Sequence, residues 1–302
     1  MHDFHHRIDT IISDNQSGST AILDQIIESL LNYQNWKSLN VPVEVRHEMK
    51  RLFDKFSNFS VVFHFINSFF NELRKNDRVE PVIRFVKDYK SQWESNLEKA
   101  CEQITREIDF NSKSVLLHSN SSAIHRLFKY LQKNHVNPQV FQTASPPVVE
   151  GKVQADVLYK MDFSVTFIQE AAVENFIREI DFAVFGADLV TEDFFINKAG
   201  TFPLALTLKY FQKPLYVFSD TRKYIKLRSL PEKVKNNLVF EKEKPKSELW
   251  NDSPDHIVVR NFYFDKTPNH LVTGFYSEQG GCNPDALASR FPGFILAPGL
   301  IG

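Results

Sequence analysis

Between residues 111 and 218 the sequence alternates short apolar runs with stretches of helical pattern. The apolar runs fall at residues 115–117, 140–141, 165–168, 182–185 and 215–218. The helical patterns lie between them, at residues 124–131, 151–159, 171–180 and 202–211. Because strands that alternate with helices are typical of a parallel, doubly wound sheet, we expect an α/β, Rossmann-like fold here. A further strand is expected at residues 257–260, after an exposed loop at residues 240–256.

The first third of the chain shows helical periodicity without intervening strands. Apolar side chains recur at helical spacing in four stretches, at residues 21–31, 49–56, 62–73 and 82–104. Cys101 lies on the last of these stripes, so we expect it to be a buried core residue. The change of pattern near residue 111 predicts two domains, a helical one at residues 1–110 and a Rossmann-like one at residues 111–302.

Composition excludes several classes of protein. The 302 residues are 42% hydrophobic and 24% charged with a formal net charge of −1, which is ordinary for a soluble globular protein and gives no electrostatic reason to expect a nucleic-acid partner. The two cysteines lack paired spacing, so neither a disulfide scaffold nor a zinc site is expected. We find no apolar signal stretch and no phosphate-loop or dinucleotide motif. We therefore expect a cytoplasmic protein with no membrane partner, no metal and no cofactor.

Residues 186–201 form the most informative segment, Gly-Ala-Asp-Leu-Val-Thr-Glu-Asp-Phe-Phe-Ile-Asn-Lys-Ala-Gly-Thr. The pattern predicts a strand end, a polar turn and the start of a helix. A carboxylate at a strand end and a Lys-Gly-Thr run at a helix N-terminus suit a phosphorylated ligand. The candidate ligand-binding residues in this segment are Asp188, Asn197, Lys198, Gly200 and Thr201.

The same segment resembles the signature of the α/β/δ subunits of eukaryotic translation initiation factor 2B. That family includes two sugar-phosphate isomerases, for methylthioribose-1-phosphate and ribose-1,5-bisphosphate, and its Gly-Ala-Asp…Asn-Lys-x-Gly-Thr positions are all matched here. The resemblance implies a helical N-terminal domain packed on a Rossmann-like domain that binds ligand and dimerises, so at least a homodimer is expected. It covers most of the second domain and, more weakly, the N-terminal helices.

A second candidate loop, residues 118–122, follows the first expected strand and contains Ser119, Asn120, Ser121 and Ser122. These residues suit either a helix cap or a phosphate site. The resemblance implies that the isomerases carry a cysteine at the position of Ser119, which works with the aspartate matching Asp188 to move a proton. A serine hydroxyl has no useful acidity without an adjacent base, and His118 should point to the opposite face. Ser119 therefore argues against isomerase chemistry.

Three further positions follow from the resemblance. Glu150 and Gly151 match a family Glu-Gly pair, but Pro146 stands where an arginine is usual, and Glu150 at a helix N-terminus is also explained by the helix dipole. Lys223 matches a lysine directed at the ligand, or else is a solvated charge. The third position is a Ser-Gly-Ser segment that matches the Arg-Gly phosphate loop of the isomerases, and its residues suit helix caps equally well. It consists of Ser17, Gly18 and Ser19.

These residues leave three hypotheses about function. The first is a binding or regulatory protein that recognises a phosphorylated sugar or a nucleotide monophosphate in a cleft that lacks the isomerase cysteine. The second is an aldose–ketose isomerase of a phosphorylated ribose or methylthioribose, with Asp188 as the catalytic residue. The third is a non-catalytic assembly protein with a vestigial cleft. We favour the first, because a vestigial cleft has no physical need for Asp188, Asn197, Lys198 and Lys223 together.

Overall fold

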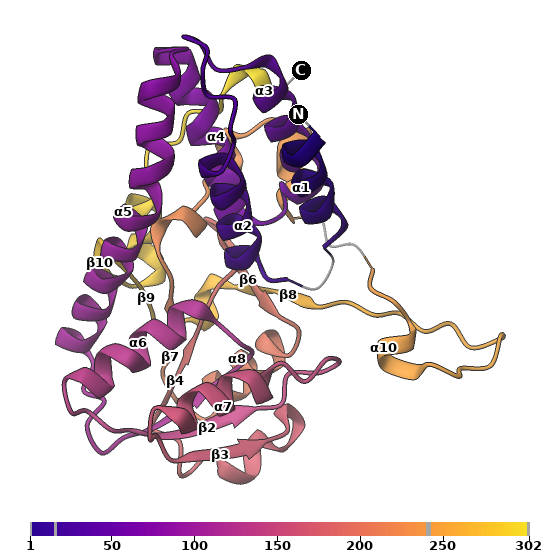
Figure 1. Cartoon of the computed structure of the whole chain (residues 1–302). Helices are drawn as coiled ribbons and strands as arrows, with labels where there is room; N and C mark the ends of the chain where they lie inside the picture. Colours follow the sequence, from indigo (N-terminus) through magenta and orange to yellow (C-terminus); the bar gives the residue numbers. More distant parts are fainter. Residues whose placement is uncertain (1, 15–16, 240–242, 301–302) are drawn as a thin grey trace. The chain divides into compact units, whose positions relative to one another are not determined.

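The computed structural model describes residues 2–14, 17–239 and 243–300 (Figure 1). The chain divides into two compact units, Met1–Ser95 with Ile225–Phe240 and Gly293–Gly302, and Asn96–Tyr224 with Glu241–Pro292. The division falls inside helix α5 (Val79–Glu107), not at residue 110. Two later segments of the chain also belong to the first unit, so a single boundary in the sequence cannot separate the two units.

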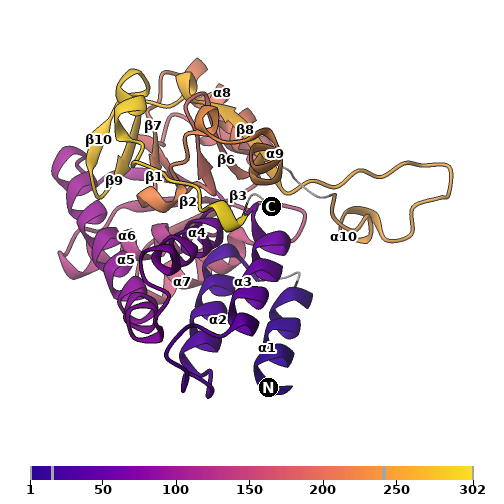
Figure 2. The ribbon, with the colours of Figure 1, turned by 90° about the horizontal axis from the view of Figure 1, so that it is seen from above.

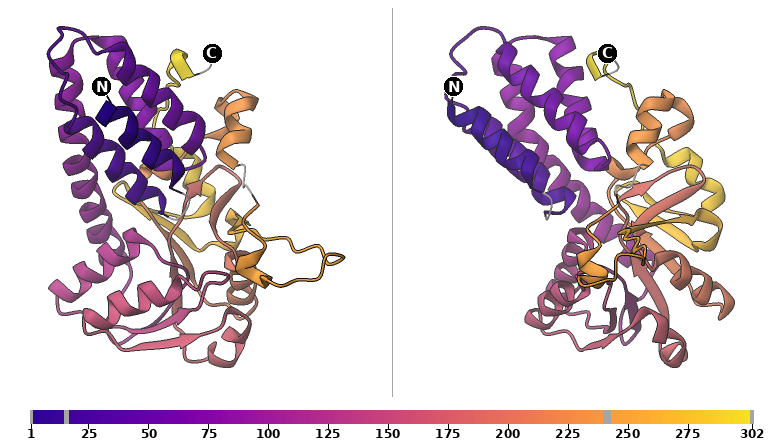
Figure 3. Two further views of the ribbon diagram at one scale, coloured as in Figure 1. Left: turned by 45° about the vertical axis from the view of Figure 1, so that its right-hand side comes forward. Right: turned by 90° about the vertical axis from the view of Figure 1, so that its right-hand side faces the viewer.

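The first unit is built on four helices that precede α5. They are α1 (His2–Ser13), α2 (Ser19–Leu31), α3 (Val43–Phe56) and α4 (Ser60–Lys75). Helix α1 packs on α2 and α3, and α4 packs on the same two helices, so the four lie side by side in both views of Figure 3. The sequence patterns predicted all of these except α1. That helix buries Phe4, Ile8 and Ile11, three residues at helical spacing.

The later segments complete this unit. Helix α9 (Glu232–Val239) belongs to the first of them. The last segment is held by Asn67 of α4. The Asn67 side chain donates to the carbonyl of Ile295 at 2.9 Å and accepts from the amide of Ala297 at 2.8 Å. The Phe63 and Phe294 rings stack with centroids 5.3 Å apart.

A seven-stranded sheet forms the centre of the second unit, in the order β10-β9-β7-β4-β1-β2-β3. Every neighbouring pair is parallel except β9 with β10. The strands are β1 (Ser114–Leu117), β2 (Gln139–Thr143), β3 (Val165–Ile168), β4 (Phe182–Phe185), β7 (Leu215–Phe218), β9 (Gly274–Ser277) and β10 (Gly280–Cys282). The predicted doubly wound sheet is confirmed, and the sequence patterns located β1, β2, β3, β4 and β7.

Both faces of this sheet are covered. In β1, Val115 and Leu117 join the core beneath α5, α6 (Ser122–Lys133) and α7 (Gly151–Lys160), whereas Leu116 joins the core beneath α8 (Thr201–Tyr210). Figure 2 shows α6 and α7 on one side of the strands and α8 on the other. Cys101 is fully buried in the first core, as predicted, and burial raises its pKa to about 12.

Two parts of the pattern were wrong. The predicted strand at 257–260 is absent, and Val258 is 82% exposed on a long arm that carries α10 (Ser247–Trp250) and extends away from the sheet in Figure 1. The predicted helix at residues 171–180 is a 3₁₀ helix, η1 (Glu170–Phe176).

A small second sheet, β5-β6-β8, was not anticipated. Its strands are β5 (Leu189–Val190), β6 (Phe194–Lys198) and β8 (Phe264–Pro268). Asn197 and Lys198 therefore end a strand and do not begin a helix, because β6 pairs with β8 along its whole length. Helix α8 starts only at Thr201.

The strand order fixes where a ligand would bind. From β1 the chain crosses through α6 to β2, whereas from β4 it leads to β7 on the opposite side of the sheet. The carboxyl ends of β1 and β4 therefore flank the topological switch point, the usual ligand position in open α/β sheets. Among residues 2–14, 17–239 and 243–300, no helix is long and apolar enough to cross a membrane.

Candidate ligand site at the carboxyl edge of the sheet

The loops after β1 and β4 carry Ser119 and Asp188 to the switch point. These loops touch each other: a Cβ added to Gly186 would lie 2.6 Å from the Ser121 hydroxyl oxygen. A side chain at Gly186 would therefore press on the Ser121 side chain, because the two loops approach closely here. The fold therefore brings together the loops that carry Ser119 and Asp188, although these two residues are far apart in the sequence.

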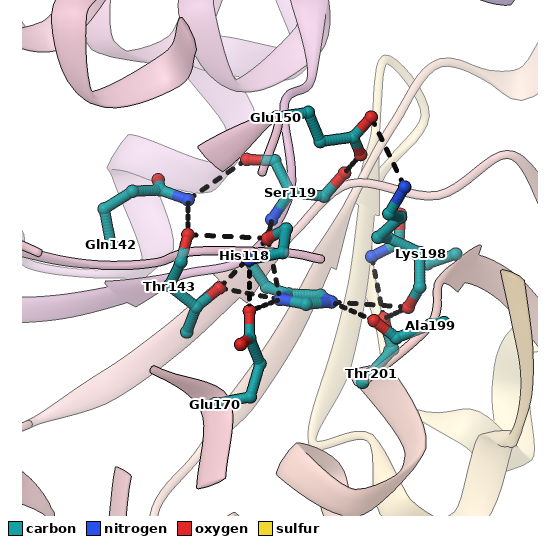
Figure 4. A network of polar contacts seen from close by, with 12 residues as sticks. His118, Ser119, Gln142, Thr143, Glu150, Glu170, Lys198, Ala199 and Thr201 are labelled. Atoms are coloured by element: carbon teal, nitrogen blue, oxygen red, sulfur yellow. Dashed lines mark hydrogen bonds and ion pairs between the residues drawn. The ribbon is translucent and has the colours of Figure 1, made fainter. Parts of the chain in front are cut away.

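Ser119 has a carboxylate partner that the sequence did not reveal. Its hydroxyl donates a short hydrogen bond to Oε1 of Glu150, and its backbone has a left-handed φ of 69° (Figure 4). The Ser119 amide donates to the Ser145 hydroxyl at 2.8 Å, and its carbonyl accepts from the Gln142 side chain at 3.1 Å. The expectation that Ser119 lacks an adjacent base was wrong, because Glu150 approaches from the loop after β2.

Glu150 also contacts Lys198. Oε2 of Glu150 lies 3.6 Å from Nζ of Lys198, with the Lys198 side chain 2% and the Glu150 side chain 30% exposed. Glu150 stands at the N-cap position of α7 but makes no side-chain cap bond there. The Lys198 ammonium also lies 4.0 Å from the centre of the Tyr263 ring, a cation–π contact that no sequence signal indicated.

Asp188 and Lys223 form the other side of this group. Burial raises the pKa of the Asp188 carboxyl above its usual range, while Lys223 opposes the shift and Glu150 adds to it. The Lys223 ammonium is buried and donates a short hydrogen bond to the carbonyl of Ala187, next to Asp188. Arg222 points elsewhere, in a two-pronged pair with Asp220 at 2.9 and 2.7 Å.

The start of α8 already holds a carboxylate. Oδ2 of Asp265, in β8, accepts from the amide of Gly200 at 2.7 Å and from that of Phe202 at 3.3 Å. The predicted phosphate residues Asn197 and Thr201 bond to each other at 3.0 Å. Two backbone donors at this helix end, the amides of Gly200 and Phe202, are thus engaged with an anion that the protein itself supplies.

A chain of buried amides positions the Ser121 turn. The Gln154 side chain donates to that of Gln142 at 2.8 Å and accepts from the amide of Ser121 at 2.9 Å. Ser121 is the N-cap residue of α6 but makes no side-chain cap bond, while its neighbours Asn120 and Ser122 are exposed. Gly151 begins α7 so close to β2 that an added Cβ would lie 1.9 Å from the carbonyl oxygen of Thr143.

Ser17, Gly18 and Ser19 lie in the first unit, at the start of α2, and the other predicted ligand residues lie in the second. Gly18 is the N-cap residue and no side chain caps the helix, so neither serine has the expected capping role. The Ser17 amide bonds to Oδ1 of Asp14 at 2.9 Å. Elsewhere in the described part of the chain, no three His, Cys, Asp or Glu side chains are placed to hold a metal ion.

The fold and the site together define a class: a doubly wound α/β protein with a helical N-terminal unit and a charged polar cluster at the switch point. The chain belongs to the initiation factor 2 subunit family, which it matches over residues 21–284. This match confirms the family predicted from residues 186–201.

Relatives include both enzymes and translation factors. The chain is 29% identical over 215 residues to a ribose 1,5-bisphosphate isomerase of Archaeoglobus fulgidus, across 69% of this chain and 66% of that one. It is 27% identical over 183 residues to translation initiation factor eIF2B subunit alpha of Dictyostelium discoideum, across 59% and 57%. The chain thus matches less than two thirds of the length of either relative.

Solved structures show the same fold. A Pyrococcus horikoshii translation initiation factor eIF-2B superposes with a TM-score of 0.76 at 19% identity, across 96% of this chain and 99% of that one. The 5-methylthioribose 1-phosphate isomerase of the same organism gives 0.74 at 17% identity, across 95% and 87%. At these identities the likeness concerns the fold alone.

Proposed function

We propose that the chain binds a phosphorylated sugar or a nucleotide monophosphate at the carboxyl ends of β1 and β4. The observation that carries the proposal is the presence of two buried lysines, Lys198 and Lys223, beside Asp188 and Glu150 at the switch point. Both ammonium groups are held by the site itself, Lys198 by Glu150 and Lys223 by the carbonyl of Ala187 beside Asp188. Two buried cations held at a switch point favour an anionic ligand. A phosphate dianion is a partner of the right charge.

The other groups suit a sugar. Glu150, Asp188 and Ser119 supply acceptors and a hydroxyl of the kind that bind ribose hydroxyl groups. Lys198 is held by Glu150 at 3.6 Å, so an incoming phosphate would share an ammonium that is already positioned. The relatives support this class of ligand, since one is a ribose 1,5-bisphosphate isomerase.

A thermal-melting series tests the proposal. Ribose 5-phosphate, ribose 1,5-bisphosphate, methylthioribose 1-phosphate and AMP are each compared with ribose and with inorganic phosphate. A ligand at 100 times its Kd stabilises the folded protein by about 2.7 kcal/mol. Lys198→Met should abolish the shift, and Lys209→Met, which changes an exposed lysine of the same unit, should preserve it. If none of the ligands shifts the melting temperature, the proposal fails and the assembly protein remains.

The isomerase is a second candidate because of one observation, the hydrogen bond from Ser119 to Glu150. It supplies a carboxylate where the sequence argument had found no base. A carboxylate able to accept a proton and an Asp188 whose pKa is raised are the complementary pair that acid–base chemistry needs.

An assay with ribose 1,5-bisphosphate and methylthioribose 1-phosphate separates the two candidates. Product formation that Glu150→Gln and Asp188→Asn each abolish would establish the enzyme. Binding without turnover would leave the binding protein. If the wild type is inactive but Ser119→Cys gains activity, the remaining site is competent and only the thiol is missing.

A homodimer also remains a prediction. Light scattering behind gel filtration measures the mass of the particle directly, and a monomer at all concentrations would contradict it.

A further inference from the structure

His118 directly follows β1 and is buried. Its Nε2 atom lies 3.3 Å from the carbonyl oxygen of Lys198 and 3.2 Å from that of Ala199 (Figure 4). Because carbonyl oxygens only accept, Nε2 carries the proton and donates to both. Burial lowers the pKa of His118 and so favours the neutral ring with its proton on Nε2. In this tautomer Nδ1 is the acceptor, the Thr143 hydroxyl donates to it at 2.7 Å, and both nitrogens are engaged.

The turn that follows Lys198 rests on this ring. Gly200 has a φ of 103°, and a Cβ added there would lie 3.1 Å from Cε1 of His118. Two carbonyl contacts and this close packing fix the backbone from which the Lys198 side chain leaves. The imidazole thus sets the position of a residue that contacts the candidate ligand site.

The same network reaches Ser119. The Ser145 hydroxyl accepts from the Ser119 amide at 2.8 Å and lies 3.2 Å from the Thr143 hydroxyl and 3.3 Å from Nδ1 of His118. The Ser145 amide in turn donates to Glu170. One buried cluster therefore joins the turns that carry Ser119 and Lys198, on either side of Glu150.

We propose that His118 is a positioning residue for the ligand site, and that it holds the Lys198 and Ser119 turns in register through its neutral imidazole. The proposal rests on the ligand-binding function proposed above. Its role is distinct from contact with ligand, since both ring nitrogens are already occupied.

Burial favours a neutral ring at physiological pH, against the effect of the charged groups around it. Burial lowers the pKa of His118, and Glu170, whose Oε1 lies 3.6 Å from Nδ1, opposes the shift with a smaller contribution from Glu150. The Lys198 ammonium is directed to Glu150, and only the Lys198 carbonyl meets the ring. Protonation would place a second donor at Nδ1, facing the Thr143 hydroxyl and Glu170.

The test uses His118→Gln and His118→Asn. Glutamine can place an amide donor where Nε2 stands, whereas asparagine is too short to reach the two carbonyls. At pH 7.5, titration calorimetry with ribose 5-phosphate should show affinity reduced on the order of tenfold or more for His118→Asn and largely kept for His118→Gln. His270→Asn, an exposed histidine of the same unit, should bind like the wild type. Wild-type affinity in His118→Asn would overturn the proposal.

A ligand-independent arm separates this inference from the proposed function. Amide hydrogen exchange at Ser119 and Gly200 should accelerate in His118→Asn, while the Thr273 amide, bonded to the carbonyl of Leu215 at 2.8 Å, serves as the control. If the wild type binds no sugar phosphate, the function fails but this measurement still decides the positioning role. Unchanged exchange at both amides would overturn it. Thr143→Val, which removes the donor to Nδ1 together with the 3.2 Å contact to the Ser145 hydroxyl, replaces His118→Asn if that variant does not fold.

Discussion

The carboxylate of Asp265 caps helix α8 through the amide of Gly200, 2.7 Å from Oδ2. The two residues come from different parts of the second unit, β8 and the turn after β6. The sequence had suggested that this helix end would meet a phosphate. The protein places its own anion there, so under the proposed function a phosphate would be bound by Lys198 and Lys223 instead.

Asp265→Ala should destabilise the protein by about 1–2 kcal/mol, because it leaves the Gly200 and Phe202 amides without their acceptor. Asp265→Asn retains an acceptor oxygen and should lose less. Urea unfolding of the three proteins measures both effects. Equal stability of Asp265→Ala and wild type would show that the cap contributes nothing.

Asp188→Asn should stabilise the protein at neutral pH, by about 1 kcal/mol, while removing a carboxylate from the proposed ligand site. Burial raises the pKa of Asp188 in the folded state above its value in the unfolded state. At a pH between these two pKa values, the folded state therefore binds more protons than the unfolded state. Stability from this group is present at low pH and is lost as pH rises through the folded pKa. Urea unfolding between pH 4 and 8 should show that slope in the wild type and a reduced slope in the variant.

Two histidines have the opposite effect on the pH dependence of stability. Burial lowers the pKa values of His118 and His125 from 6.5, so the unfolded chain binds more protons just below that pH. Their contribution to stability is therefore present above pH 6.5 and is lost as pH falls through the folded pKa values. His125→Gln should flatten the acid limb of a stability–pH curve without affecting ligand binding at pH 7.5. An unchanged acid limb would contradict the assignment of His125.

Gly151→Ala should cost about 3 kcal/mol, the upper range for forced overpacking. Its Cβ would lie 1.9 Å from the Thr143 carbonyl oxygen and 2.9 Å from that of Ala144, so α7 must move away from β2. Gly293→Ala is the matched control, with nothing within 4 Å of the added atom. Urea midpoints of the two variants compare them directly, and a neutral Gly151→Ala would refute the steric argument.

Sequence pattern located much of the sheet because its central strands are buried on both faces and are therefore apolar throughout. The same rule failed at residues 257–260, where β-branched residues sit on the arm without a partner strand. The strand that does form, β8, contains Asp265 and Lys266 and is stabilised by pairing with β6. No local pattern signals such a pairing across about 70 residues, since it depends on tertiary contact.

The candidate site was predicted in part. Ser119, Glu150, Lys198, Asp188 and Lys223 do gather around the switch point, with the contacts described above. Whether they bind ligand stays a prediction. Sequence reasoning did not anticipate Tyr263 and Asp265. Asp265 lies on β8 and Tyr263 directly precedes it, whereas the sequence pattern predicted a strand at residues 257–260.

The first unit contains residues that are synthesised first and residues that are synthesised last. Asn67 emerges early from the ribosome, yet its bond with Ala297 spans 230 positions of sequence. Chains are made at about 5–20 residues per second, and N-terminal parts generally fold first. Here α4 can complete its contacts with residues 293–300 only after the strands of the sheet have been translated. A truncation that removes those residues would therefore be expected to destabilise the part of the protein that was made first.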